Sequence, residues 1–485
     1  MSLRSTVTRK AGVRLASFGV ALFLVAGRSA WAQEAKTALA APALVDDPLL
    51  ARLVKDALEE RPEVAQAQAT IRADHERVPQ ASALPDPMLS LGIQNDGFRS
   101  IQIGEMETSY LSVMASQTFP WYGKRDLRGD VTSLAAAQAE ADLARLRLSI
   151  RGAVERAYVD LLLVRDELGL LGKLEALWTQ AEGLARTRYE AGEGAQSDLL
   201  RAQLEKSRLR QRRWALEAEQ RRRVAALNRL RGHALGESID TARSLADLPD
   251  PALPSDAVAF AQAEAQSPEL QKWRLATEQS NRLVDLAAKD YFPDLTLSAA
   301  VMPRFGKFSP MWQAGLSFAI PLWAGSKQAR AVEENRQRGT AAERGAEATR
   351  QMLRERVEER QTLLAALRET NQLFRGGLLV QSEASVASTM AQYRVGRVGF
   401  ASVLEALTGY VADLNAFYES IAVTQRVAIA EREVSLDPLA SLSAGGMGGA
   451  AVPGAALMGA GASSAAAMPA ADATGAAGAG APSRM

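Results

Sequence analysis

The 485-residue chain has 57 lysines and arginines against 56 aspartates and glutamates, so its formal net charge is +1. This balance gives no overall field that would favour a nucleic-acid partner. The chain has no cysteine, which excludes a disulfide framework, a thiolate nucleophile, a zinc–thiolate site and an acylated N-terminal cysteine. Its two histidines, His75 and His233, are too few for a multi-histidine metal site, and we expect no metal or cofactor.

Residues 1–32 have the pattern of a secretory signal peptide. Basic residues between Arg4 and Arg14 precede an apolar stretch from Leu15 to Val25, and Ala30-Trp31-Ala32 supplies a small-residue cleavage site. A membrane anchor needs about 20 consecutive apolar residues, more than this stretch provides. We therefore expect cleavage after Ala32 and export of the mature chain.

Sequence landmarks of the mature chain occur twice, which predicts a tandem duplication. The two copies of each landmark are separated by about 200 residues, too many for one unit of a solenoid. We assign the first repeat to residues 33–244, a proline-rich linker to 245–256 and the second repeat to 257–437, and we expect the Ala/Gly-rich segment 438–485 to be a disordered tail. The paired landmarks are Pro62 and Pro268, Pro85 and Pro293, Pro120 and Pro321, and Tyr189 and Tyr393.

Each repeat contains two segments in which apolar residues alternate with small or polar ones. They span residues 88–94 and 110–119 in the first repeat and 295–302 and 312–320 in the second. This alternation predicts strands with one apolar face and one small, polar face. In the first segment, Leu89, Leu91 and Ile93 share a face. A strand of a soluble sandwich has the same pattern as a strand of a membrane barrel, so any single strand is compatible with either.

Long heptad-patterned regions follow the strands. Every seventh residue from Leu143 to Ala185 is apolar, and the second repeat has a similar series from Leu353 to Leu378 that Arg360 and Asn371 interrupt. The first region predicts one helix over residues 126–188, about 95 Å long at 1.5 Å per residue. Such a repeat indicates supercoiled helix packing.

The long helices reverse at glycine-bearing turns, with tips near residues 189–200 and 393–405. Glycine after a helix adopts the left-handed conformation at low cost. Ser402 and Glu405 fit a capping box at the start of the next helix, and Asp198 stands where a carboxylate favours a helix start. We expect these turns to be structural and also functional.

Both strand-to-helix corners carry a proline and aromatic residues. Strands of 8–10 residues match a tilted membrane crossing, and a sheet in lipid must close on itself. Bacterial barrels start at eight strands, so four strands per chain predict that three chains share one twelve-stranded barrel. The corner residues expected at the headgroup level are Pro120, Trp121, Tyr122, Pro321 and Trp323, with Lys124, Arg125 and Lys327 just outside.

The tandem plan, the corners FPWYGKR and IPLWAGSK and the paired YxxG turns resemble the TolC family of outer-membrane efflux proteins, over about residues 46–437. The resemblance implies a mixed α+β membrane protein and a homotrimer. A twelve-stranded outer-membrane β-barrel would continue as a long periplasmic α-helical barrel. It implies the exit duct of a tripartite pump, with a periplasmic adaptor (membrane-fusion) protein and an inner-membrane transporter of the resistance-nodulation-division type as partners.

The resemblance also implies roles for the tips. In the family, side chains at these turns hold the closed aperture together and line its narrowest ring. Asp198 and Tyr393 match members of that tie, and Glu405 matches an acidic ring position. Ser402 falls where another acid often stands, and Arg397 is one place from the usual basic residue. The residues expected to contact the adaptor are Tyr189, Gly192, Gly194, Tyr393, Gly396 and Gly399.

Cargo and alternative functions are less closely specified by the sequence. The loop GEMETSYLSV (104–113) and the corner look like the branch that accompanies heavy-metal pumps, which implies metal cations or small toxic compounds as cargo. The alternatives are the duct of a type I protein secretion system and an exported coiled-coil scaffold. No P-loop, G-x-S-x-G or H-E-x-x-H pattern occurs, so we expect no enzymatic activity.

Overall fold

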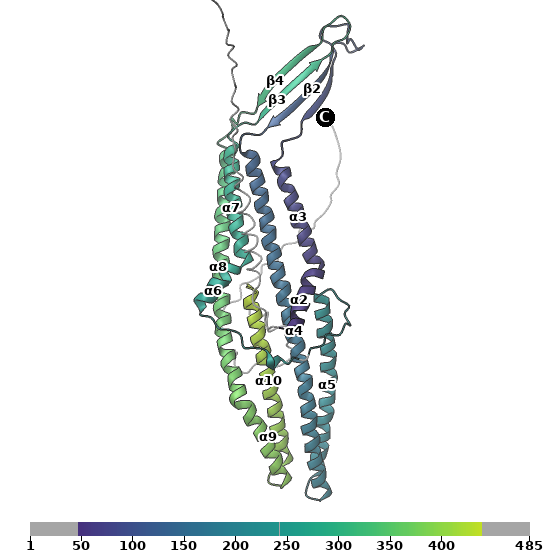
Figure 1. Ribbon diagram of the computed structural model, residues 1–485, viewed down its shortest axis with the longest axis vertical. Helices are drawn as coiled ribbons and strands as arrows, with labels where there is room; N and C mark the ends of the chain where they lie inside the picture. The colour runs from purple at the N-terminus through teal and green to yellow at the C-terminus, as the bar shows by residue number, and fades with distance from the viewer. Residues whose placement is uncertain (1–46, 242, 439–485) are drawn as a thin grey trace, which may run out of the picture. The chain divides into compact units, whose positions relative to one another are not determined.

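The computed structural model describes residues 47–241 and 243–438, which lie in one compact unit. The expected signal peptide and nearly all of the expected tail lie outside the described residues. Figure 1 shows a set of long helices with a small sheet at one end; the α4–α5 and α9–α10 connections lie at the other end.

The order helix, helix, strand, strand, helix, helix occurs twice. The first set is α2 (Pro48–Glu60), α3 (Pro62–Ser82), β1 (Met88–Gln94), β2 (Tyr110–Phe119), α4 (Lys124–Glu190) and α5 (Gln196–Leu230). The second set is α6 (Asp256–Gln266), α7 (Pro268–Lys289), β3 (Leu295–Met302), β4 (Met311–Phe318), α8 (Gln328–Leu373), the π-helical turn η2 (Phe374–Leu378), α9 (Leu379–Arg394) and α10 (Phe400–Arg432). A 3₁₀ turn, η1 (Leu245–Asp247), lies in the linker, whose Leu245 and Leu248 are buried in the core.

The four strands form one antiparallel sheet in the order β1-β2-β3-β4. Strand β4 ends at Phe318, two residues earlier than we expected from the sequence. The chain already turns there, because the Leu322 N–H donates to the Ile320 carbonyl at 2.9 Å and Pro321 has no N–H to extend a ladder. The register places Leu91 opposite Val113 and Leu297 opposite Leu316, so the apolar residues share one face.

That apolar face is open to solvent in the single chain. Leu91 is 75% exposed, Ile93 68% and Leu316 59%. Figure 1 shows the sheet extending beyond the helix ends, without a helix along its strands. Exposed apolar surface of this kind marks an interaction with lipid or with another chain.

The helices bury the heptad residues that the sequence predicts. Helix α4 has 67 residues, or about 100 Å at 1.5 Å per residue. Its mid-section packs with α2, α5 and α10 through residues such as Leu53, Leu161 and Ile421, while Trp178 packs with Leu407 near the tips. The two interruptions of the second series, Arg360 and Asn371, are also buried, each at 1% exposure.

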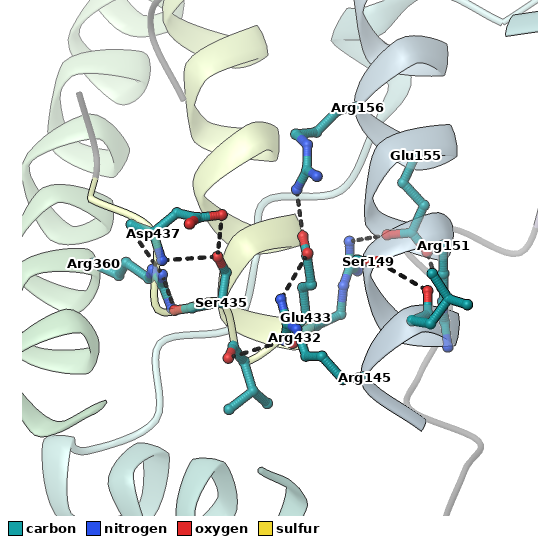
Figure 2. Close-up of polar contacts among 12 residues, drawn as sticks. Arg145, Ser149, Arg151, Glu155, Arg156, Arg360, Arg432, Glu433, Ser435 and Asp437 are labelled. Carbon is teal, nitrogen blue, oxygen red and sulfur yellow. Dashed lines mark hydrogen bonds and ion pairs between the residues drawn. The ribbon is translucent and has the colours of Figure 1, made fainter. Parts of the chain in front are cut away.

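A buried charge cluster joins α10 to α4 near the middle of the helices (Figure 2). The carboxylate of Glu433, which follows α10 and is 5% exposed, lies 3.1 Å from Arg145 Nη2 and 2.5 Å from Arg156 Nη1. Glu155, also on α4, pairs with Arg432 at 3.0 Å. Each buried carboxylate therefore has an arginine from the other helix, which offsets the cost of removing the charge from water.

Arginines also bind the main chain that follows α10. Arg145 Nη1 donates to the Glu433 carbonyl at 2.9 Å, Arg356 Nε donates to Leu436 O at 3.3 Å, and Arg360 donates to Ser435 O and Asp437 O. Burial lowers the pKa of Arg360 to about 10, against the opposing effect of Glu431 and Glu433. This segment, 433–437, is thereby held against α4 and α8.

Gly152 is the residue of α4 that makes room for the Glu433 carboxylate. A Cβ at position 152 would overlap that carboxylate and lie 3.1 Å from Arg156 Nη1. We predict that Gly152→Ala destabilises the protein by about 3 kcal/mol, the usual cost of disturbing a buried ion pair. The midpoint of thermal unfolding, followed by circular dichroism, measures this.

Gly169→Ala is the matched control, because Gly169 lies exposed on the same helix and a Cβ there meets nothing within 4 Å. Alanine favours a helix over glycine by about 1 kcal/mol, so this control is expected to stabilise. Equal effects of the two substitutions would contradict the role assigned to Gly152.

Candidate functional site

The two tips have the same backbone geometry. Gly192 and Gly396 have φ angles of +72° and +73°. The Gly192 N–H donates to Tyr189 O and the Gly396 N–H donates to Tyr393 O, both at 3.0 Å. Only glycine adopts this left-handed conformation without strain, so the YxxG pattern specifies both turns.

The other two glycines at the tips differ from each other. A Cβ on Gly194 would lie 2.9 Å from Arg188 Cβ and 3.0 Å from Tyr189 N, so the close turn requires glycine. Gly399 has φ −81° and open space around it, and it is the N-cap of α10. The capping box that we expected from Ser402 and Glu405 is therefore wrong. The helix begins at Phe400, before Ser402, because the extended backbone of Gly399 already ends the turn.

Tyr393 links the two tips. Its side chain is 1% exposed, and its hydroxyl donates to Asp198 Oδ2 at 3.3 Å, in the first turn of α5. Its ring meets Phe400 edge-on at a centroid distance of 5.5 Å. The Arg188 guanidinium lies 5.0 Å from the same ring, and its Nη1 donates to Tyr393 O at 2.8 Å. These contacts hold the α4–α5 turn against the α9–α10 turn within one chain.

Burial raises the pKa of Tyr393 to about 12, from an ordinary value of 10.0, and the charge and hydrogen bond of Asp198 act in the same direction. A pKa raised in the folded protein means that the neutral phenol is favoured there. The contact therefore contributes its full stability below about pH 10 and loses it as the pH rises towards 12.

The remaining predicted gate residues lie apart from this contact. Arg397 and Glu405 are exposed on the single chain and Ser402 is half-buried. The structure thus brings together Asp198 and Tyr393. Arg188 was not among the predicted site residues, although its place in the last turn of a helix, beside the YxxG pattern, is a signal for a cation that contacts helix-end carbonyls.

The first strand-to-helix corner is more buried than we predicted. Trp121 stacks on Phe292 with ring centroids 5.1 Å apart and planes at 10°, and its backbone N–H donates to Asp294 Oδ1 at 2.9 Å. In contrast, Tyr122 and Trp323 are 88% and 75% exposed. Only these two aromatics have the exposure that contact with lipid headgroups requires.

Lys124, which we predicted to lie just outside the membrane, is a buried residue of the corner. Lys124 is 4% exposed, and its Nζ lies 3.1 Å from Asp290, 2.9 Å from Asp294 and 3.0 Å from Phe292 O. It connects α4 to the segment between α7 and β3. Its counterpart Lys327 is exposed, and Arg125 is half-buried and donates to Ser82 O at 2.7 Å.

Among residues 47–241 and 243–438, no group of three or more His, Asp and Glu side chains is placed to hold a metal ion. No helix in the same part of the chain has the length and hydropathy to cross a membrane.

Comparison with known proteins assigns the family. The family model for the outer membrane efflux protein matches residues 53–233 and 259–432. The chain belongs to this family. The expected resemblance to TolC-type outer-membrane efflux channels is thereby confirmed, and so is the outer-membrane location.

Solved channels share the fold. The chain is similar to the outer-membrane channel OprN, with 20% identity and a TM-score of 0.66, over 80% of this chain and 90% of that one. It is similar to the outer membrane protein VceC of Vibrio cholerae, with 18% identity and a TM-score of 0.63, over 79% and 95%. The open state of the MtrE channel of Neisseria gonorrhoeae gives 16% identity and a TM-score of 0.63, over 80% and 89%.

A relative with higher identity is matched over a shorter length. Protein CyaE of Bordetella pertussis is 31% identical over 204 residues, which span 41% of this chain and 43% of that protein. The match thus covers less than half of either chain.

We predict that Tyr393→Phe loosens the tips while leaving the fold intact. Loss of the hydroxyl bond to Asp198 costs about 1 kcal/mol, which accelerates local opening about fivefold. Hydrogen exchange of the backbone amides in residues 393–400 measures the opening. Tyr189→Phe is the control, because Tyr189 is 44% exposed at the matching place in the first repeat. Unchanged exchange in Tyr393→Phe would contradict the tie.

We predict that Lys124→Met destabilises the protein by about 2 kcal/mol, less than a fully buried pair because the two aspartates keep some contact with water. Lys327→Met, at the exposed counterpart, is expected to have no effect. The thermal unfolding midpoints of the two variants in detergent measure this. Equal midpoints would contradict a stabilising role for the ion pairs of Lys124.

Proposed function

We propose that the protein is the exit duct of a tripartite efflux system, formed by three copies of this chain in the outer membrane. The observation that carries this proposal is the four-stranded sheet, which has one exposed apolar face and two edge strands. Family membership supports an efflux channel, and the geometry of the described residues supports the proposed trimer and gate.

The sheet supports the trimer. Strands β1 and β4 are its edges, and in lipid their free backbone groups must be paired because no water is present to bind them. Four strands are too few for a bacterial barrel, whereas three copies supply twelve. Edge β4 of one copy would pair with β1 of the next.

The helices also have surfaces that a second copy would cover. Leu200 and Leu204 on α5 are 56% and 51% exposed, Trp214 is 68% exposed, and Val380 on α9 is 62% exposed. Leu200, Leu204 and Trp214 have the spacing of a heptad seam that no helix of residues 47–241 and 243–438 covers. A neighbouring copy would bury this seam, as a closed helical barrel requires.

The other face of the sheet fits a water-filled lumen. It carries serine, threonine and glycine, including Ser112, Ser298 and Ser317, and the four strands contain no Asp, Glu, Lys or Arg. Such a wall selects weakly and conducts passively. The chain would therefore supply neither catalysis nor energy, and an inner-membrane pump would drive transport through a periplasmic adaptor.

The tips fit the roles of gate and adaptor contact. The link between Asp198, Tyr393 and Arg188 holds the two hairpins of one chain together, and Glu405 is exposed on α10. Three Glu405 carboxylates around one axis would favour cations at the mouth. Adaptor binding would open the aperture by favouring a second arrangement of the hairpins.

In this proposal, the inner-membrane partner determines the cargo. We propose heavy-metal cations or small toxic compounds, delivered by a resistance-nodulation-division transporter. The duct of a type I protein secretion system would have the same architecture, so the identity of the inner-membrane partner distinguishes the two. An exported scaffold would need the heptads but would have no use for the open apolar sheet face.

Planar-bilayer recording of the purified protein tests the duct. We predict ohmic single-channel conductance from a heat-modifiable trimer, and Glu405→Gln is expected to reduce cation preference by removing charge from the mouth. Glu343→Gln, which removes an exposed carboxylate on α8, is the control and is expected to change nothing. A monomer that forms no channels would contradict the proposal.

A further inference from the structure

Methionine is confined to one face of the sheet. The register places every Leu, Ile, Val and Phe of the four strands on the apolar face, and every methionine on the opposite, small and polar face. There is one methionine on each strand. The four are Met88 on β1, Met114 on β2, Met302 on β3 and Met311 on β4.

These four residues, which we call the methionine row, are neighbours across the sheet. Met88 is opposite Ser116, so it is diagonal to Met114. Met114 is opposite Ala300, so it is diagonal to Met302, which is directly opposite Met311. Directly opposed side chains have Cβ atoms about 5 Å apart and diagonal ones about 7 to 8 Å, within reach of long side chains.

The row runs from the end of β1 that follows α3 to the loop end of β3 and β4. Residues 303–310 join β3 to β4 at that end, away from the helices in Figure 1. In the proposed membrane orientation, Met88 thus lies nearest the periplasmic side of the lumen wall, and Met302 and Met311 lie nearest the outside. This inference rests on the proposed function, because only closure by three copies turns this face into a lumen.

Packing does not account for the row. Met88 is 65% exposed, Met114 and Met311 are each 37% exposed, and Met302 is half-buried but belongs to no core cluster of the described residues. The surrounding positions are Ser, Thr, Gly, Ala, Gln and Tyr, any of which would face water at lower cost. What methionine adds to such a wall is a thioether sulfur, a soft and neutral ligand.

We propose that the methionine row is a transit site for soft monovalent cations, Cu(I) or Ag(I), in the lumen of the duct. Soft thioether ligands select Cu(I), whereas carboxylates suit harder ions, and the four strands contain no carboxylate. Conduction requires sites that bind weakly and repeat along the path. A row of neutral, single-sulfur ligands meets both conditions, and each sulfur passes the ion to its neighbour without a change in protonation.

Silver nitrate in a chloride-free planar-bilayer recording tests this site on the full-length trimer. We expect Ag(I) to produce brief blocks of the single-channel current. The quadruple variant M88L/M114L/M302L/M311L keeps apolar volume but has no sulfur, and it is expected to conduct like the wild type and to lose the blocks. Met352→Leu, at an exposed methionine on α8, is the control and is expected to keep them.

Two further measurements keep the test decisive. If the quadruple variant does not assemble, M302L/M311L removes only the directly opposed pair and is expected to shorten the blocks. Thioethers do not titrate, so the block is expected to be constant from about pH 5 to about pH 8.

The possible failures are separable. Channels that conduct but show no Ag(I) block, or a block that survives loss of the four sulfurs, would overturn the methionine site and leave the duct intact. Absence of any conductance from the wild-type trimer would instead overturn the proposed function.

Discussion

The edges of the four-stranded sheet constrain how this chain can exist in a membrane. Within the described residues, β1 and β4 each have one hydrogen-bonded neighbour, and the apolar face has no covering layer. An isolated sheet of this kind exposes unpaired backbone groups, which are unfavourable in lipid, and apolar side chains, which are unfavourable in water. Closure by further copies satisfies both at once. The closed sheet would also set where the long helices begin, since each strand pair leads directly into a helix that starts at the sheet.

Helix α4 is the element that connects the two repeats along their length. Near the sheet, Lys124 binds the segment before β3; at mid-length, Arg145 and Arg156 bind Glu433; and at the tip, Arg188 binds Tyr393. All three contacts join residues more than 160 positions apart in sequence. A polar contact specifies register more strictly than an apolar seam, in which side chains can slide. The repeats are thus aligned by charges and packed by heptads.

Periodicity explains what the sequence alone could predict. The strands, the long helices and the left-handed glycines depend on residues within a few positions of one another, and the structure has them close to where the patterns placed them. The contacts of Lys124 and Arg188 could not be predicted from local patterns, because their partners come from the other repeat. The serine and glutamate of the expected capping box were misleading for the opposite reason: a local pattern was present, but Gly399 had already started the helix.

The π-helical turn η2 has a consequence for symmetry. Helix α4 has 67 residues, and α8, η2 and α9, with 46, 5 and 16, together also have 67. A π turn takes up one extra residue without added rise, so the second path is about 1.5 Å shorter and its side chains beyond η2 are rotated by about 100°. The two tips also differ in packing, since Tyr189 is 44% exposed and Tyr393 only 1%. A ring of three duplicated chains would be nearly sixfold at the sheet, and this π turn leaves only threefold equivalence at the opposite end.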